Sequence, residues 1–115
     1  MSPTELSSEF MGIPEEEAFG LSRAAVMLDQ ARQDRTNRMA MTEALNHNLE
    51  LWVAIKTLVS REENGVPSNV RENLVKLGNF IADTTFKSAD GDLTDETIDT
   101  LININLQISE GLLEG

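Results

Sequence analysis

Four stretches of apolar residues at intervals of three and four constrain this chain most, because such spacing gathers the apolar side chains on one face of an α-helix. Tyrosine is absent and aromatic residues make up 4% of the chain, which leaves little material for the faces of a sheet. The 115 residues are enough for one domain, and 40% apolar residues are enough for its core. The sequence therefore predicts an all-α fold, a small bundle of about four antiparallel helices.

A short break is expected between the first two helices. The first helix begins at Pro14, which suits a first helical turn, and the glutamates after it face the positive end of the helix dipole. Its apolar stripe consists of Leu21, Ala24, Ala25, Leu28 and Ala31. Because this stripe then meets Arg35 and Arg38, we place the break near Asp34–Asn37. One continuous helix through residue 60 is the alternative.

The second helix is predicted from about Arg38 to Ser60. Its stripe consists of Met41, Leu45, Asn48, Trp52, Ile55 and Val59. Further leucines beside this stripe widen it, which indicates a helix that is contacted on more than one side. A turn follows at Asn64-Gly65, a dipeptide that is typical of turns.

Two further helices complete the prediction. One begins at Pro67, ends near Lys87 and carries the stripe Val70, Leu74, Leu77 and Ile81. The other follows Thr94 as its N-cap and carries the stripe Ile98, Leu101, Ile102, Asn105, Ile108 and Leu112. Residues 1–12 have only weak periodicity. We therefore expect a mobile segment over residues 1–12 and a single helical domain over residues 13–115.

The charge balance limits the partners that the chain can bind. Twenty acidic side chains against nine basic ones give a net charge of −11, which opposes contact with nucleic-acid phosphates. The locally basic stretch contains Arg32, Arg35 and Arg38. We expect it to form the pairs Asp29–Arg32 and Asp34–Arg38 on an exposed helix, with contact to RNA as the less favoured alternative.

The sequence offers little for catalysis. It has no cysteine, which excludes a thiolate metal site or a cysteine nucleophile, and no apolar run near ~18 residues that would span a membrane. His47 shares a helix face with Glu43 and Glu50, which we interpret as a solvated face. The loop Asp90–Asp95 fails the calcium-loop template, because its twelfth position is Leu101. We expect a cytoplasmic protein that is not an enzyme and uses no cofactor or metal.

Two asparagines occupy positions in apolar stripes. A buried amide without hydrogen-bond partners costs about 1–3 kcal/mol, so Asn48 and Asn105 must be satisfied in some way. They either bond to each other or to a helix end inside the bundle, or they face a partner. We favour the structural interpretation.

Three pieces of sequence, in order, resemble the bacterial flagellar regulator FlaF family. The first runs from Ala44 to Trp52 (Ala-Leu-Asn-His-Asn-Leu-Glu-Leu-Trp), the second from Asn64 to Arg71 around Val-Pro, and the third from Leu101 to Leu112. The resemblance covers about residues 40–112 well and residues 14–35 loosely. Val66 and Val70 depart from it, since the family more often has leucine there.

The resemblance implies a non-enzymatic protein of flagellum assembly, similar in role to an export chaperone for flagellin. Flagellin is the expected partner, with the regulator FlbT as a further one. Flagellin ends in long amphipathic helices, and an apolar groove on a small helical protein could cover such a helix. The alternative is a post-transcriptional regulator that acts on flagellin messenger RNA directly or through FlbT.

Most of the residues expected to contact the partner match the family pattern. Gly111 matches the pattern too, but it is not among the expected contact residues. They are Leu51, Trp52, Asn64, Pro67, Arg71, Asn105, Ile108 and Leu112. Each has a structural alternative, in the core, at a helix start or in an ion pair, and we favour these alternatives over direct contact.

Overall fold

The computed structural model describes residues 15–61, 66–88 and 93–114. In these ranges the regular elements are the helices α2 (Glu15–Gln33), α3 (Arg38–Val59), α4 (Ser68–Ser88) and α5 (Asp95–Glu114), which confirms the predicted all-α fold. The expected mobile segment over residues 1–12 and the turn at Asn64-Gly65 lie outside the described residues, as do residues 90–92 of the loop at residues 90–95.

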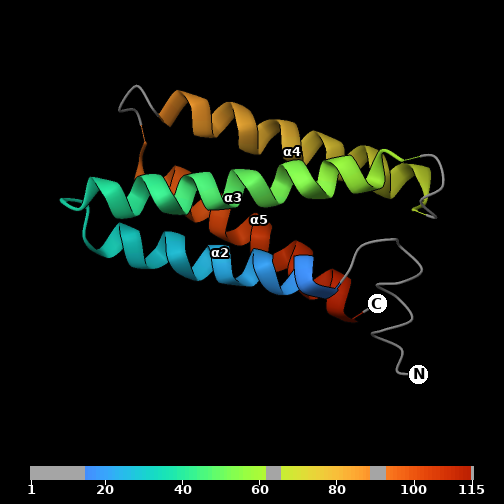
Figure 1. Ribbon diagram of the computed structural model, residues 1–115, viewed down its shortest axis with the longest axis horizontal. Helices are drawn as coiled ribbons and strands as arrows, with labels where there is room; N and C mark the ends of the chain where they lie inside the picture. Colours follow the sequence, from blue (N-terminus) through green and yellow to red (C-terminus); the bar gives the residue numbers. More distant parts are fainter. Residues whose placement is uncertain (1–14, 62–65, 89–92, 115) are drawn as a thin grey trace.

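Successive helices alternate in direction along the long axis of the molecule (Figure 1). α2 packs against both α3 and α5, and α3 also packs against α4. The first and last of these helices are therefore neighbours, with α5 lying behind α2 and α3 in Figure 1. The arrangement measures 45 × 25 × 19 Å, and it confirms the predicted small antiparallel bundle.

The predicted stripes form the core. Every residue named for the first and second helices is buried, which leaves little of either stripe for contact with solvent. On α4 and α5 only part of each stripe is buried, namely Leu74, Ile81, Ile98, Leu101, Asn105 and Leu112. The half-buried remainder includes Val70 and Ile108. These two helices thus keep part of their apolar surface accessible.

The helix ends follow from local side-chain chemistry. The helical structure is interrupted between α2 and α3 at residues 34–37, as predicted. At the start of α3, the Asn37 side chain accepts a hydrogen bond from the backbone N–H of Ala40 at 3.1 Å. The Thr94 hydroxyl accepts one from the backbone N–H of Thr97 at 3.2 Å, which confirms Thr94 as the cap of α5. Capping satisfies amides that have no partner within the first helical turn.

Candidate groove between α4 and α5

One side of the bundle is left open. α4 packs along α3 and α5 packs along α2, whereas α4 and α5 approach each other at few points. The space between them is a groove, here called the α4–α5 groove, which is hollowed at both of its ends. The lining residues of α4 form two groups, one in each hollow, and from Asn69 to Ser88 they extend over about 30 Å at 1.5 Å per residue.

The end of the groove near the start of α4 is apolar. This apolar hollow measures about 440 Å³ and is lined by Asn69, Val70, Asn73, Leu74, Gln107, Ile108, Gly111 and Leu112. Amide side chains accompany the apolar ones, and no charged side chain of the described residues lines it. In a chain with a net charge of −11, such a lining favours an uncharged, apolar occupant.

The opposite end of the groove is rich in hydroxyl groups. This hydroxyl hollow measures about 510 Å³ and is lined by Phe80, Thr84, Lys87, Ser88, Glu96, Thr97 and Thr100. Lys87 forms an ion pair with Asp83 on its own helix at 3.0 Å. The two ends of the groove therefore present different chemistry to whatever lies along it.

A buried network of hydrogen bonds joins α5 to α2 and α3. The Asn105 amide nitrogen donates to the Asn48 side-chain oxygen at 2.6 Å and to the backbone oxygen of Leu21 at 3.2 Å. The hydroxyl of Ser109 donates to the backbone oxygen of Ala18 at 2.6 Å. The favoured interpretation, in which Asn48 and Asn105 bond to each other inside the bundle, is confirmed.

The residues predicted to contact a partner are dispersed. Ile108 and Leu112 lie in the apolar hollow. Trp52 and Asn105 are 0% exposed, so in this arrangement they support the core behind the groove. Whether these residues contact a partner stays a prediction.

The other predicted contact residues lie away from the hollows. Leu51 is half-buried on α3 beside Gly20, and Pro67 is exposed just before α4. Arg71 is half-buried and donates to the backbone oxygen of Val66 at 3.5 Å. Asn64 lies outside the described residues.

Sequence reasoning missed the α4 side of the groove as a binding surface. The sequence predicts Val70 and Leu74 only as members of an apolar stripe on a helix, and no pattern in it distinguishes Asn73 or Gln107. No local pattern identifies them, because an apolar stripe has the same spacing whether another helix covers it or leaves it open.

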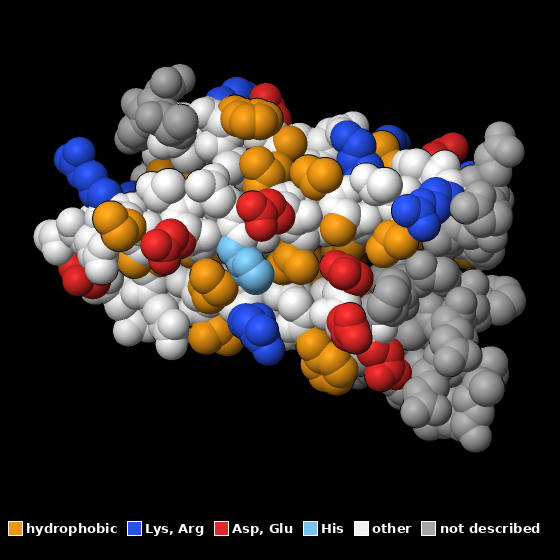
Figure 2. Space-filling model, viewed as in Figure 1, with side chains coloured by type: hydrophobic (Ala, Val, Ile, Leu, Met, Phe, Trp, Pro, Cys, Tyr) orange, Lys and Arg blue, Asp and Glu red, His pale blue; other side chains and the backbone are white. Residues whose placement is uncertain are grey.

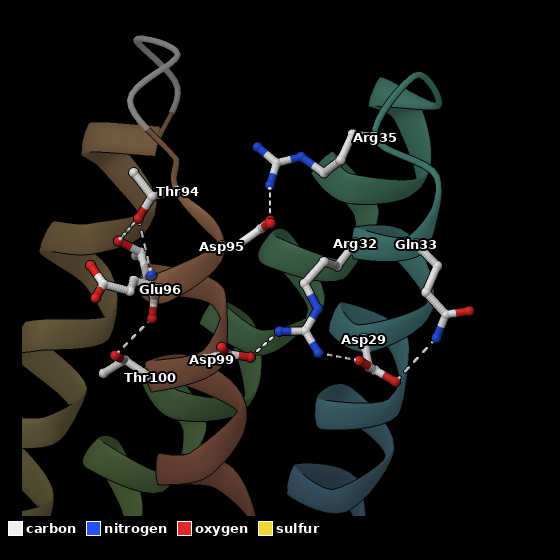
Figure 3. Close-up of polar contacts among 10 residues, drawn as sticks. Asp29, Arg32, Gln33, Arg35, Thr94, Asp95, Glu96, Asp99 and Thr100 are labelled. Atoms are coloured by element: carbon white, nitrogen blue, oxygen red, sulfur yellow. Dashed lines mark hydrogen bonds and ion pairs between the residues drawn. The ribbon is translucent and has the colours of Figure 1, made fainter.

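The predicted arginine cluster joins helices. The guanidinium of Arg32 lies between Asp29 of α2 and Asp99 of α5, and that of Arg35 donates to Asp95 at 2.8 Å (Figure 3). Arg35 also donates to the backbone oxygen of Leu93 at 2.8 Å. The pair Asp29–Arg32 is confirmed. Two of the three arginines are thus engaged within the protein.

The predicted pair Asp34–Arg38 is wrong for the described residues. The break between α2 and α3 separates these side chains, so they do not share a continuous helix face. The Asp34 carboxylate accepts a hydrogen bond from the Thr36 hydroxyl within the turn instead.

On the face drawn in Figure 2, hydrophobic side chains are interspersed with acidic, basic and histidine side chains. Exposed apolar residues such as Phe19, Val26 and Val53 are common when they occur singly. Among the described residues, no three histidine, aspartate or glutamate side chains are grouped as a metal site would need. Every described helix is too polar or too short to serve as a membrane span.

Comparison with known protein families gives a match to this chain. The sequence profile of a family described as "Flagellar protein FlaF" matches residues 7–112. The chain belongs to the FlaF family of flagellar proteins. The resemblance seen in the sequence is confirmed, and membership in FlaF implies a role in flagellum biogenesis. No curated protein and no solved structure matches this FlaF chain.

Proposed function

We propose that this FlaF protein binds flagellin and acts as its export chaperone and regulator, with an amphipathic flagellin helix held in the α4–α5 groove. The observation that carries the proposal is the uncharged apolar hollow between α4 and α5. Membership in a flagellar family makes a flagellar protein the natural partner, and the sequence resemblance implies flagellin.

The size of the groove suits a single helix. Its length of about 30 Å matches a helix of about 20 residues. A helix laid between α4 and α5 would contact the half-buried side chains of Val70 and Ile108, which the bundle itself covers only in part. This is the helix-in-groove mode, in which an amphipathic helix buries its apolar face against a matching surface.

The charge of the protein supports a carrier role. Like charges on separate copies repel, so a net charge of −11 opposes self-association while the useful surface stays apolar. The same charge disfavours direct contact with messenger RNA, and Arg32 and Arg35 are already paired with aspartates. Any effect on flagellin messenger RNA is therefore better carried by the partner regulator FlbT.

The test measures flagellin binding by the purified full chain. We expect a 1:1 complex at micromolar concentrations, and we expect Ile108→Glu to weaken it about tenfold or more, because a carboxylate would be buried against an apolar helix face. The matched control is Val53→Glu on α3, a site that is 54% exposed and lies outside the groove. Circular dichroism checks that both variants keep their helices.

Two outcomes would overturn the proposal. One is the absence of binding by the unchanged protein at micromolar concentrations. The other is equal binding by Ile108→Glu and Val53→Glu. Hydrogen exchange of the complex locates the binding surface. We expect binding to protect backbone amides of α4 and α5, and not those on the exposed face of α3.

A further inference from the structure

The hydroxyl hollow presents hydrogen-bond acceptors. The Thr100 hydroxyl donates its proton to the backbone oxygen of Glu96 at 3.0 Å, as Figure 3 shows, and the Ser88 hydroxyl donates to the backbone oxygen of Thr84 at 2.8 Å. A hydroxyl group has one proton and two lone pairs. Once the proton is bonded to the preceding helical turn, only the acceptor side of the oxygen is available to a ligand.

The hydroxyl hollow also contains two charged groups of opposite sign. The carboxylate of Glu96 accepts hydrogen bonds, and the ammonium group of Lys87 is paired with Asp83. The bonded hydroxyl groups and the Glu96 carboxylate therefore favour an occupant that brings uncharged donors, such as the amides of asparagine and glutamine.

The apolar hollow contains a glycine that the bundle does not need. α5 continues past Gly111 to Glu114, so Gly111 does not end the helix. A methyl group added there would meet no heavy atom within 4 Å among the described residues, whereas one on Gly78 would contact Lys56 and Trp52. Glycine weakens a helix interior relative to alanine, so its presence at an open position needs another reason.

We propose that the two ends of the α4–α5 groove bind different kinds of side chain from the flagellin helix. The backbone of the bound helix passes closest to α5 over Gly111, its apolar side chains fill the apolar hollow, and its hydrogen-bond donors enter the hydroxyl hollow. This inference rests on the proposed function, and it adds the chemistry of the bound segment at each end of the groove.

Two substitutions test the ends separately, each with a matched control. Thr100→Val removes an acceptor with little change of shape, and we expect it to weaken flagellin binding about two- to tenfold, as the loss of one hydrogen bond would. Thr57→Val is its control, because the Thr57 hydroxyl bonds in the same way to Val53 on the exposed side of α3. We expect that control to bind as the unchanged protein does.

Gly111→Ala tests the close approach. We expect the variant to unfold at a higher urea concentration, since alanine favours the helix, yet to bind flagellin at least about fivefold more weakly, since the methyl group occupies space needed by the bound backbone. Gly78→Ala is the control, because the same change on α4 faces α3 and leaves the groove unaltered. A merely structural role for Gly111 would not raise stability and lower binding together.

The outcomes separate this inference from the proposed function. If the unchanged protein binds flagellin while Thr100→Val and Gly111→Ala bind as tightly as their controls, this further inference is overturned and the proposed function stands. If the unchanged protein does not bind flagellin, both are overturned. Weakening confined to the two groove variants supports both.

Discussion

The indole N–H of Trp52 donates a hydrogen bond to the side-chain oxygen of Asn105 over 2.9 Å in the fully buried centre of the bundle. The amide nitrogen of Asn105 in turn donates to Asn48 and to the backbone of Leu21. A single side chain on α5 thereby bonds to both α3 and α2. Such bonds are satisfied only when the helices pack in one register, so they favour this arrangement over others of equal apolar content.

The first prediction concerns Asn105. Asn105→Leu removes three hydrogen bonds and leaves the Trp52 N–H buried without an acceptor, so we expect the free energy of unfolding to fall by about 2–4 kcal/mol. Urea denaturation measures this. Asn103→Leu, at an exposed position of the same helix, should change stability by no more than about 0.5 kcal/mol. Similar midpoints for the two variants would contradict the prediction.

A second prediction compares Asn48 with Asn105. The Asn48 side-chain oxygen accepts one bond, and its amide nitrogen is buried without a partner among the described residues. Asn48→Ala should therefore cost less stability than Asn105→Ala. A double-mutant cycle should give a coupling of about 0.5–1.5 kcal/mol, the value of one hydrogen bond. Strictly additive effects would show that the bond contributes nothing.

The third prediction concerns the ion pair between Arg32 of α2 and Asp99 of α5. The Asp99 side chain is 57% exposed, so the pair is screened by solvent, and a double-mutant cycle with Arg32→Gln and Asp99→Asn should give about 0.5–1 kcal/mol. The coupling should shrink as sodium chloride is raised from about 0.05 to 1 M, because salt screens exposed charges. A coupling that does not change with salt would argue against an electrostatic origin.

The fourth prediction contrasts two glycines inside helices. A methyl group on Gly78 would make ordinary contacts, the nearest at 3.5 Å from Lys56, so Gly78→Ala should raise stability by about 0.5–1 kcal/mol. On Gly20 the methyl group would lie 3.0 Å from the Leu51 side chain, which would have to shift. Gly20→Ala should gain less than Gly78→Ala or lose stability, and thermal unfolding of the two variants decides the order.

Much of the fold follows from local sequence. The spacing of apolar residues on α2 and α3 gave the buried faces, and the arginines after Ala31 marked the break before Arg38. Threonine at position 94 identified the start of α5, because its side chain serves an amide only three residues away. These features depend on neighbours in the chain, which is why the sequence alone predicts them.

The binding surface depends on which helices meet, and local patterns do not determine that. Ile108 was predicted as a contact residue from its stripe, but its neighbours across the groove, Val70 and Leu74, belong to a helix that could equally have packed against α5. Trp52 is a predicted contact residue because it matches the family pattern, and the helix pairing buries it completely. Pairing is a property of the whole chain, so the α4–α5 groove emerges only with the structure.

The packing of α2 against α5 has a consequence for how the protein is made. These two helices form the most extensive contact between helices in the described residues, and the bond from Ser109 to Ala18 joins positions 91 residues apart. During synthesis the small alanine-rich face of α2 leaves the ribosome long before α5 exists to cover it. The main interface of the bundle can therefore form only after α5 has been synthesised, and the long loop that must close slows its formation.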